Sequence, residues 1–467
     1  MKRISIIGFL FMLVLAGCDS FLDEKPQQSI DAEKALSTGE NIRLVMNSAY
    51  VNTRNAFGQQ LFHGAELLAD NGEVYFQGTY LEPREYIGKY LVASSTWPQA
   101  AWQDLYKAIY ISNQVLKHIE KVDETSRPQI EGEALFIRGL CYFELARFYA
   151  PAYDAGSQNT ADAVPLVLET DEELYPARST VAQVYSQART DLETAASKLS
   201  EDENFFASRW AALGVLSRLY LVQELWAEAA QAASDVIGSG YFELSATPFE
   251  AFNHASNGPE DVFAFQQNND ENLGSENGTG NEGMSTFYAS TNVTGRSDFA
   301  ITETLFALYE SDDLRAEIQV DLNEETSDEK DIKSLYYLGF GNSNDGGIFC
   351  AKWLNFANNM TFIRLAEMYL TRAEANFQNA STIGDTPLND IKTIRERAGI
   401  TTPESIDLDF IRKERIRELI FEGQRLHDYK RWEWPVGDLP PNSPRLVFPI
   451  PQRERDVNEN LSQNEGY

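Results

Sequence analysis

The chain has 467 residues, of which 43% are hydrophobic and 24% charged, an ordinary globular composition that excludes a disordered, collagenous or coiled-coil protein. Its 71 acidic residues outnumber the 39 basic ones and give a formal net charge of -32. Such a charge repels phosphate backbones and anionic lipid, so the composition argues against nucleic-acid binding. Three cysteines are too few to hold a fold together by disulfides.

A short apolar run, 4–15, follows two basic residues near the start of the sequence. It is too short for the roughly 20 residues that a membrane-spanning helix needs, and we interpret residues 1–17 as a signal peptide. The run ends in Leu-Ala-Gly-Cys, which resembles the lipobox of bacterial lipoproteins. Cys18 would then carry acyl chains that anchor the mature protein. The alternative is an ordinary secretory signal, and Asp19 leaves the choice between inner and outer membrane open.

Three segments share one helical pattern. In each, a large apolar residue is followed four positions later by a small one and three positions after that by tyrosine, which places all three on one helical face. The segments are Leu135, Gly139 and Tyr142; Leu213, Ser217 and Tyr220; and Phe362, Ala366 and Tyr369. The small residue lets a second helix approach closely, as in the first helix of a tetratricopeptide repeat. Unrelated amphipathic helices with the same spacing are the alternative.

Only the second segment is followed by a clear partner helix. The expected positions recur at Ala229, Ala233 and Val236, and glycine ends the pattern. After the first segment, Pro151 stands where a small residue is expected, and the third segment is degenerate as well. We therefore predict a mostly α fold, built on a scaffold of tetratricopeptide-like helix pairs with an irregular, loop-rich excursion.

Two further helices are predicted from local signals. Thr180 and Gln183 have the spacing of a capping box, which opens a helix. The stretch 411–426 is dense in alternating arginine and glutamate. We expect Leu419 and Phe421 to be buried there while the charged side chains bridge to their neighbours.

Two segments, 63–100 and 253–300, lack helical periodicity. The first mixes glycine, asparagine, proline and aromatic residues, and the second is rich in asparagine, glycine, serine and glutamate. Irregular stretches this long inside a helical protein are usually functional or disordered. Because no linker divides the chain, we predict one domain over 18–467, with ligand-binding segments near 63–100 and 253–347.

The sequence contains no recognisable catalytic arrangement. Its four histidines are too far apart for a zincin pair, and no nucleophile elbow or phosphate-binding loop occurs. Glycines at 278, 280 and 283 spell a dinucleotide-binding motif, but they lie in an irregular loop. No pair among the acidic residues is distinguished as a glycosidase pair. We therefore predict no catalytic residues, no enzymatic activity and no cofactor.

The sequence leaves two alternatives open, a bound calcium ion and a disulfide bond. Asn268, Asp270 and Asn272 alternate as calcium ligands do, although the loop lacks the glycine and the final glutamate of an EF-hand. A structural calcium ion is the alternative there. Cys141 lies in an apolar helix and is expected to be a core residue, with a disulfide to Cys350 as the alternative.

Aromatic residues in the irregular segments are the best candidates for a binding site. Rings on loops are costly to expose to water unless they meet a ligand, and sugar rings offer them flat C–H faces. These rings are Tyr75, Phe76, Tyr80, Trp97, Phe287 and Tyr288. Nearby side chains that can bind hydroxyl groups are Asp70, Asn71, Arg84 and Arg296. From both sets we select as ligand-binding candidates Asp70, Asn71, Tyr75, Tyr80, Trp97, Tyr288 and Arg296, with structural packing as the alternative for each.

Several short motifs then occur in a fixed order along the chain. They are the lipobox at Cys18 with Phe-Leu-Asp at 21–23, the helix at 133–143, Pro-Ala-Arg-Ser-Thr at 176–180, the helix at 363–370, Glu-Leu-Ile-Phe-Glu-Gly-Gln-Arg at 418–425, Pro-Ile-Pro at 449–451 and Gln-Asn-Glu-Gly-Tyr at 463–467. In this order they resemble the SusD/RagB family of Bacteroidetes lipoproteins. The resemblance covers essentially the whole mature chain, and the motifs are specific in combination.

The resemblance implies a helical scaffold of four tetratricopeptide-like pairs, with an excursion that holds most of the ligand site. It also implies a surface-exposed, lipid-anchored protein of the outer membrane. Such a protein would capture oligosaccharides for a SusC-like TonB-dependent transporter, or peptides as in the RagB branch. No ligand residue carries over by motif, so Trp97 and Tyr288 are candidates by region. A surface glycoside hydrolase and a protein-docking adaptor are the remaining alternatives.

Overall fold

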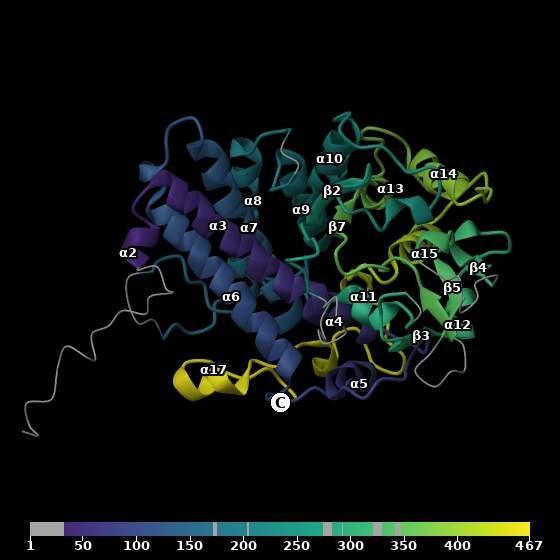
Figure 1. Ribbon diagram of the computed structural model, residues 1–467, viewed down its shortest axis with the longest axis horizontal. Helices are drawn as coiled ribbons and strands as arrows, with labels where there is room; N and C mark the ends of the chain where they lie inside the picture. Colours follow the sequence, from purple (N-terminus) through teal and green to yellow (C-terminus); the bar gives the residue numbers. More distant parts are fainter. Residues whose placement is uncertain are drawn as a thin grey trace, which may run out of the picture.

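Helices are the main regular structure of the protein in its computed structural model (Figure 1). The structure describes residues 32–170, 175–202, 205–273, 283–291, 293–320, 329–340 and 347–467, so the predicted signal peptide and Cys18 lie outside it. The helices are α2 (Ala32–Ala35), α3 (Gly39–Asn55), α4 (Phe62–Leu67), α5 (Leu81–Gly88), α6 (Thr96–Lys117), α7 (Arg127–Tyr149), α8 (Val181–Lys198), α9 (Arg209–Val222), α10 (Trp226–Ile237), α11 (Met284–Tyr288), α12 (Glu303–Phe306), α13 (Leu365–Gln378), α14 (Pro387–Arg397), α15 (Leu408–Leu419), α16 (Arg425–Arg431) and α17 (Gln452–Val457). The predicted mostly α fold is confirmed.

Short strands form two small sheets. The strands are β1 (Val74–Phe76), β2 (Asp261–Phe265), β3 (Phe299–Ile301), β4 (Ile318–Gln319), β5 (Tyr336–Gly339), β6 (Gly347–Cys350) and β7 (Met360–Arg364). One sheet has the order β1-β3-β6-β5-β4, in which only β4 and β5 run parallel. The other joins β2 to β7, and β7 continues directly into α13.

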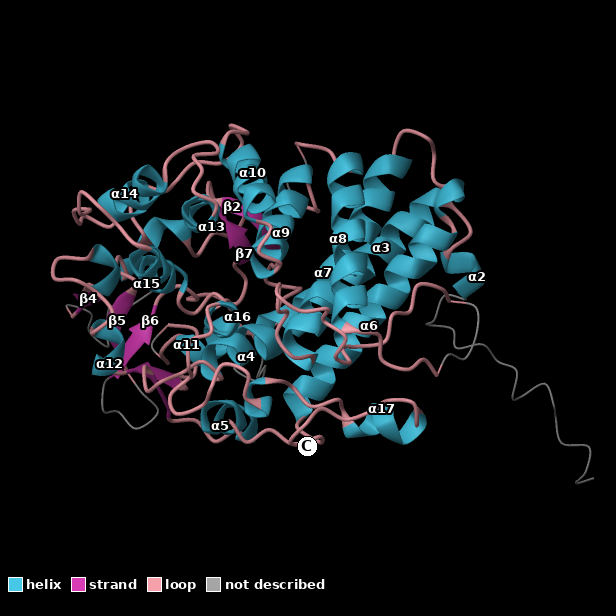
Figure 2. Ribbon diagram, turned by 180° about the vertical axis from the view of Figure 1, so that it is seen from behind, coloured by secondary structure: helices cyan, strands magenta, loops and turns pink. Residues whose placement is uncertain are grey.

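The helices pack side by side in pairs, α7 with α8, α9 with α10 and α13 with α14, while α3 lies against α6. In both views α2 and the five-stranded sheet lie at opposite ends of the molecule, with α7, α8, α9 and α10 between them and α14 at the same end as the sheet (Figures 1 and 2). This arrangement confirms the helix-pair scaffold. A large hydrophobic core runs from Leu36 to Leu461, and a smaller cluster fills the space between α13, α14 and α15.

The pair α7 and α8 confirms both sequence signals in that part of the chain. Thr180 accepts a hydrogen bond from the N–H of Gln183, whose side chain accepts one from Thr180 N–H, which completes the capping box at the start of α8. Gly139 of α7 lies against α8, as the small position of the repeat requires. The pattern did not identify α8 as the partner of α7, because Pro151 ends α7 and a long connection separates the two helices.

Two helix predictions near the end of the chain are wrong in part. Phe362 lies in β7 instead of on the helical face of Ala366, since the backbone stays extended as far as Arg364 and α13 begins only afterwards. The predicted helix 411–426 is divided into α15 and α16. The chain turns between them through left-handed conformations at Phe421 (φ 66°) and Gly423 (φ 76°).

The irregular segments contain more regular structure than predicted. Residues 63–100 include most of α4, β1, α5 and the first turn of α6, and the described part of 253–300 includes β2, α11 and β3. Their glycine, proline and asparagine content concealed these elements, which are short. The proline at position 83 lies near the start of α5, where a helix tolerates it.

Candidate functional site

Strand pairing brings the two irregular segments together at one edge of the five-stranded sheet. Tyr75 of β1 lies opposite Ala300 of β3, and Phe76 lies opposite Phe299. Beyond the strands, the Gln77 side chain donates to the carbonyl oxygen of residue 297 at 2.5 Å. Segments more than 200 residues apart in sequence therefore build one surface.

Three of the predicted residues lie on this surface, which we call the sheet-edge surface. Tyr75 is 63% exposed, because strand alternation turns it to the face opposite Phe76. Tyr80 is half-buried, and the guanidinium carbon of Arg296 lies 4.5 Å from the centre of its ring. Arg296 Nε also donates to Asp298 Oδ2 at 3.0 Å. The surface can thus stack a ring on a sugar and donate hydrogen bonds to its hydroxyl groups.

A layer of buried rings supports this surface from below. The Tyr80 ring lies 6.3 Å from Phe287, and the Phe76 ring lies 5.6 Å from Phe299. Arg84, which is exposed, donates from Nη2 to the carbonyl oxygen of residue 78 at 2.8 Å, and its guanidinium lies 5.7 Å from the Phe76 ring. The packed rings beneath hold the exposed side chains in defined positions.

Trp97 and Tyr288 belong to that buried layer, which corrects their prediction as exposed stacking rings. Trp97 is 6% exposed and Tyr288 is fully buried. Both stack on His63, at 5.4 Å and 5.6 Å between ring centres, and Phe287 meets the same histidine edge-on at 4.8 Å. The reason is that Trp97 lies in the first turn of α6 and Tyr288 at the end of α11, and both helices turn these side chains inward.

Asn71 and Asp70 lie in one turn but differ in exposure. Asn71 is exposed, whereas Asp70 is only 5% exposed and accepts hydrogen bonds from the N–H groups of Gly72 and Val74, both at 3.0 Å. Burial raises the pKa of the Asp70 carboxyl to about 6. The prediction that Asp70 faces a ligand is therefore corrected. Its carboxylate shapes the turn that presents Asn71.

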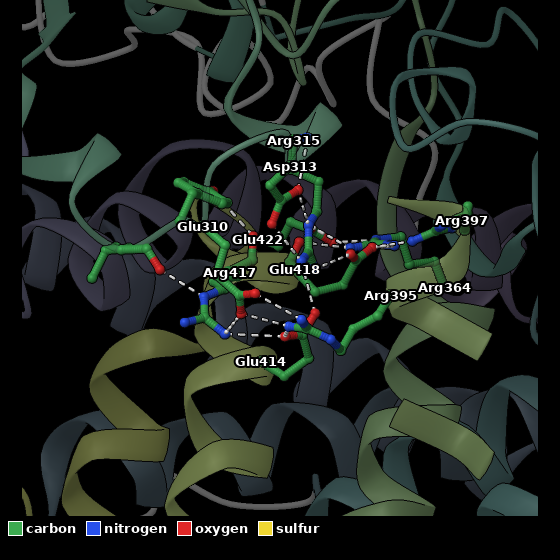
Figure 3. Close-up of polar contacts among 12 residues, drawn as sticks. Glu310, Asp313, Arg315, Arg364, Arg395, Arg397, Glu414, Arg417, Glu418 and Glu422 are labelled. Carbon is green, nitrogen blue, oxygen red and sulfur yellow. Dashed lines mark hydrogen bonds and ion pairs between the residues drawn. The ribbon is translucent and has the colours of Figure 1, made fainter. Parts of the chain in front are cut away.

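A buried network of ion pairs, which we call the ionic network, lies beside the sheet (Figure 3). Its acidic members are Glu260, Glu310, Asp313, Glu414, Glu418 and Glu422. Its basic members are Arg315, Lys352, Arg364, Arg395, Arg397 and Arg417, which match the acids in number. The alternating charges of 411–426 predicted bridging, and the network shows that most of the bridges lie inside the protein, with the partly exposed Glu310 at its edge.

Glu418 is the centre of the ionic network. It accepts hydrogen bonds from Arg364 at 2.7 Å and Arg315 at 3.0 Å, and it also pairs with Arg397. Burial alone would raise the pKa of the Glu418 carboxyl, but these guanidinium groups outweigh it and hold that pKa well below its usual range. Arg315 belongs to the excursion and Glu418 to α15, so the pairs connect the sheet region to the helices.

The two described cysteines are not paired. Cys141 and Cys350 are both buried and free, so the alternative of a disulfide between them is wrong, and Cys141 is the core residue that was predicted. In the loop for which a calcium ion was the alternative, the Asn268 side-chain oxygen accepts hydrogen bonds from the N–H groups of Asp270 and Glu271, both at 2.8 Å.

The described ranges contain no cluster of three histidine, cysteine or carboxylate side chains able to hold a metal. Nor does any helix within them combine the length and the apolar character needed to cross a bilayer.

Comparison with known proteins identifies this architecture. Residues 20–221 match a family described as "Starch-binding associating with outer membrane", and residues 336–442 match the SusD family. SusD-like protein P38 from Formosa agariphila is 23% identical over an alignment that covers 100% of both chains. The starch-binding protein SusD of Bacteroides thetaiotaomicron is 29% identical over 29% of this chain and 31% of its own length.

Solved structures agree with these matches. A SusD superfamily protein from Bacteroides thetaiotaomicron has a TM-score of 0.79 and 26% identity, with 91% of this chain and 99% of that chain covered. Surface glycan-binding protein A from Bacteroides fluxus has a TM-score of 0.72 and 20% identity, with 92% and 100% covered. The fold is thus that of SusD-like proteins. The chain belongs to the SusD/RagB family, as its motifs predicted.

Proposed function

We propose that this protein binds an oligosaccharide at the cell surface and delivers it to a SusC-like TonB-dependent transporter. The observation that carries the proposal is the sheet-edge surface, where strand pairing joins the segment of Tyr75 and Tyr80 to that of Arg296, and Arg296 lies on the Tyr80 ring. Tyr75 offers a face for stacking, while Arg296 and the nearby Asn71 can bond to hydroxyl groups. The family description, starch binding in association with the outer membrane, supports the same ligand class and location.

The proposed binding is reversible and breaks no bond in the ligand. A protein that passes its ligand to a transporter has to release it, and very tight binding would make release slow. We therefore expect dissociation constants in the micromolar range or weaker, which corresponds to about 8 kcal/mol of binding free energy or less.

The proposed location depends on acylation of Cys18. Two or three acyl chains hold a folded protein on a membrane stably without a spanning helix. Growth of the native bacterium with labelled palmitate should label the wild-type chain and leave Cys18→Ala unlabelled. Loss of membrane association in Cys18→Ala would support the anchor, and an unlabelled wild-type chain would contradict it.

Calorimetric titration tests the binding surface. The chain from residue 19 onward would be titrated with a panel of neutral oligosaccharides, and Tyr75→Ala and Tyr80→Ala with the ligand that binds best. Each variant should lower the affinity about fivefold or more, since a lost ring contact costs about 1 kcal/mol. Tyr110→Ala is the matched control, because Tyr110 is 53% exposed but lies on α6 away from the sheet.

Two outcomes would overturn the proposal. Silence with every oligosaccharide, together with binding of peptides, would favour capture of peptides as in the RagB branch. Appearance of new reducing ends in a polysaccharide incubated with the pure protein would show a glycoside hydrolase.

A further inference from the structure

A second concave surface lies among the ends of several helices, away from the sheet-edge surface. This groove, which we call the α16 groove, has a volume of about 960 Å³ and is lined by the last residues of α9, α13 and α16, by the start of α10, by Arg412 of α15 and by residues of the connecting loops. A volume of this size accommodates several sugar rings. Neither Tyr75 nor Tyr80 is among its lining residues.

Lys430 is a buried cation in the wall of the groove. The residue is 8% exposed, and within the described chain it takes part in no ion pair. Its one hydrogen bond there, at 3.5 Å, goes to the carbonyl oxygen of Arg147 in α7. That carbonyl has no helical donor four residues later, because Pro151 has no N–H. An ammonium group has three N–H donors, so two of them have no partner among the residues described.

The environment of Lys430 disfavours its charge in the empty groove. Burial, and secondly the guanidinium of Arg147, lower the pKa of the Lys430 ammonium to about 7. Burial first, and then the nearby cations Arg147 and Lys430, hold the pKa of the His427 imidazole well below its usual range. No carboxylate of the described chain neutralises the positive charge of Lys430. An anion bound in the groove would do so.

Arg412 is a second incompletely compensated cation of the groove. Its side chain is 18% exposed, and its Nε lies 3.7 Å from Glu374 Oε1 without a hydrogen bond. That oxygen already accepts hydrogen bonds from Arg431 and from the Trp432 indole, both at 2.7 Å. Arg431, in contrast, makes three hydrogen bonds to Glu374 and Asp428. Arg412 therefore has more N–H donors left for a ligand than Arg431.

Aromatic and amide side chains complete the surface. Trp226 is half-buried at the start of α10, and Trp432 forms part of the groove while Arg412 and Arg431 lie on its ring at 5.5 Å and 4.8 Å. The amides of residues 378 and 442 also line the groove. Acidic residues, among them Glu224 and Glu433, are present too, but they are exposed at the rim, where water and salt screen them.

We propose that the α16 groove binds an acidic saccharide, with its carboxylate placed against Lys430 and Arg412 and a sugar ring against Trp226. Buried cations act at low dielectric, so they attract a carboxylate more strongly than the screened acidic rim repels it. The groove would thus give a chain with a net charge of -32 a local site for an anionic ligand. A neutral saccharide would leave Lys430 uncompensated and should bind less well.

Titration with two probes of equal length tests this proposal. The chain from residue 19 onward is titrated at low salt with a tetramer of galacturonic acid and, separately, with maltotetraose. The wild-type protein should bind the acidic tetramer, and Lys430→Met and Arg412→Gln should each weaken that binding about tenfold.

Controls separate the groove from the sheet-edge surface. Tyr75→Ala should leave binding of the acidic tetramer unchanged. Trp226→Ala, at a half-buried position, gives a second test of the groove in case Lys430→Met unfolds, which thermal melting would reveal. The proposal is overturned if the wild-type protein ignores the acidic tetramer, if Lys430→Met and Arg412→Gln both bind it as tightly as the wild type, or if Tyr75→Ala abolishes its binding. None of these results bears on neutral ligands at the sheet edge.

Discussion

Gly139 of α7 and Ala188 of α8 bring the backbones of the two helices into contact. A Cβ atom placed on Gly139 would lie 3.0 Å from the carbonyl oxygen of Ala188 and 2.8 Å from Cγ of Leu192. Real Cβ atoms rarely come so close to backbone, so one of the helices would have to shift. The glycine is therefore a packing requirement of the first helix pair.

Gly139→Ala should destabilise the protein, although alanine is the better helix former. In an unconstrained helix this change would add about 1 kcal/mol of stability, but overpacking at a tight contact costs about 1–3 kcal/mol or more. We expect a net loss, measured as the free energy of unfolding in urea. Gly156→Ala is the control, since Gly156 is exposed and should change stability by no more than about 0.5 kcal/mol. A Gly139→Ala variant as stable as the wild type would show that the helices are not in contact there.

Glu418→Gln should destabilise the folded protein more than most substitutions that alter a side chain as little. The variant keeps the shape of the side chain but leaves Arg364, Arg315 and Arg397 without their shared carboxylate. Breaking a buried ion pair by removing one partner costs about 3–5 kcal/mol, because the remaining charge stays buried. Denaturant unfolding measures the loss.

Glu396→Gln is the matched control for the ionic network. Glu396 pairs with Lys392 one helical turn away at 3.5 Å, but both side chains are more than half exposed. Exposed pairs of this kind contribute about 0.3–0.5 kcal/mol. If Glu418→Gln and Glu396→Gln lower the free energy of unfolding equally, the ionic network is accessible to water.

Stability should fall in acid, partly through Glu367. Burial alone would raise the pKa of this carboxyl, but Arg218 at 2.6 Å and Arg415 at 3.0 Å outweigh it and lower the pKa to about 2. Because the folded-state pKa lies below the unfolded value of about 4.5, the unfolded chain takes up the proton first as pH falls. The stabilisation, about 3 kcal/mol, is complete above pH 4.5 and is lost as pH falls to about 2.

Unfolding measured at a series of pH values checks this. Glu367→Gln should lose stability at pH 7 and show a shallower fall between pH 4.5 and 2 than the wild type. Glu396→Gln should keep the wild-type slope. Parallel curves for Glu367→Gln and the wild type would contradict the assignment of the lowered pKa to this carboxylate.

Cys141 and Cys350 should be chemically silent in the folded protein. Burial raises the pKa of both thiols to about 12, so almost no thiolate forms at neutral pH, and reagents cannot reach the sulfur atoms. In the chain from residue 19 onward, Ellman's reagent should detect no thiol before unfolding and both thiols in guanidinium. Failure to detect thiols after unfolding would indicate a disulfide, and fast reaction before unfolding would indicate that the core opens readily.

Local signals predicted the helical scaffold well. The capping box at Thr180 and the small residue at Gly139 depend on contacts within a few turns of helix, and the structure contains both. The sequence pattern does not predict that α7 packs against α8, because this pairing depends on the path of the long connection between the two helices. Phe362 was misassigned for a related reason, since pairing of β7 with β2, about a hundred residues earlier, keeps its backbone extended.

The sequence predicted the region of the candidate site better than it predicted the individual residues. The sequence indicated both irregular segments, and β1 and β3 do join them. It did not distinguish Tyr75, which strand alternation exposes, from Trp97, which the first turn of α6 buries. Composition tells where aromatic residues gather. Which of them face solvent depends on the orientation of short helices and strands, and that orientation is determined only by the folded structure.

Trp97→Ala should separate the role of the buried rings from that of the exposed ones. Trp97 contacts Tyr86, His63 and Phe287, with ring centres 5.4–5.7 Å apart, so its removal leaves a large cavity and should cost about 3–5 kcal/mol of unfolding free energy. Tyr75→Ala should change stability by no more than about 0.5 kcal/mol but weaken ligand binding. Measuring unfolding and ligand affinity on both variants distinguishes the roles. Loss of affinity in Trp97→Ala with wild-type stability would contradict its place in the core and return it to the binding surface.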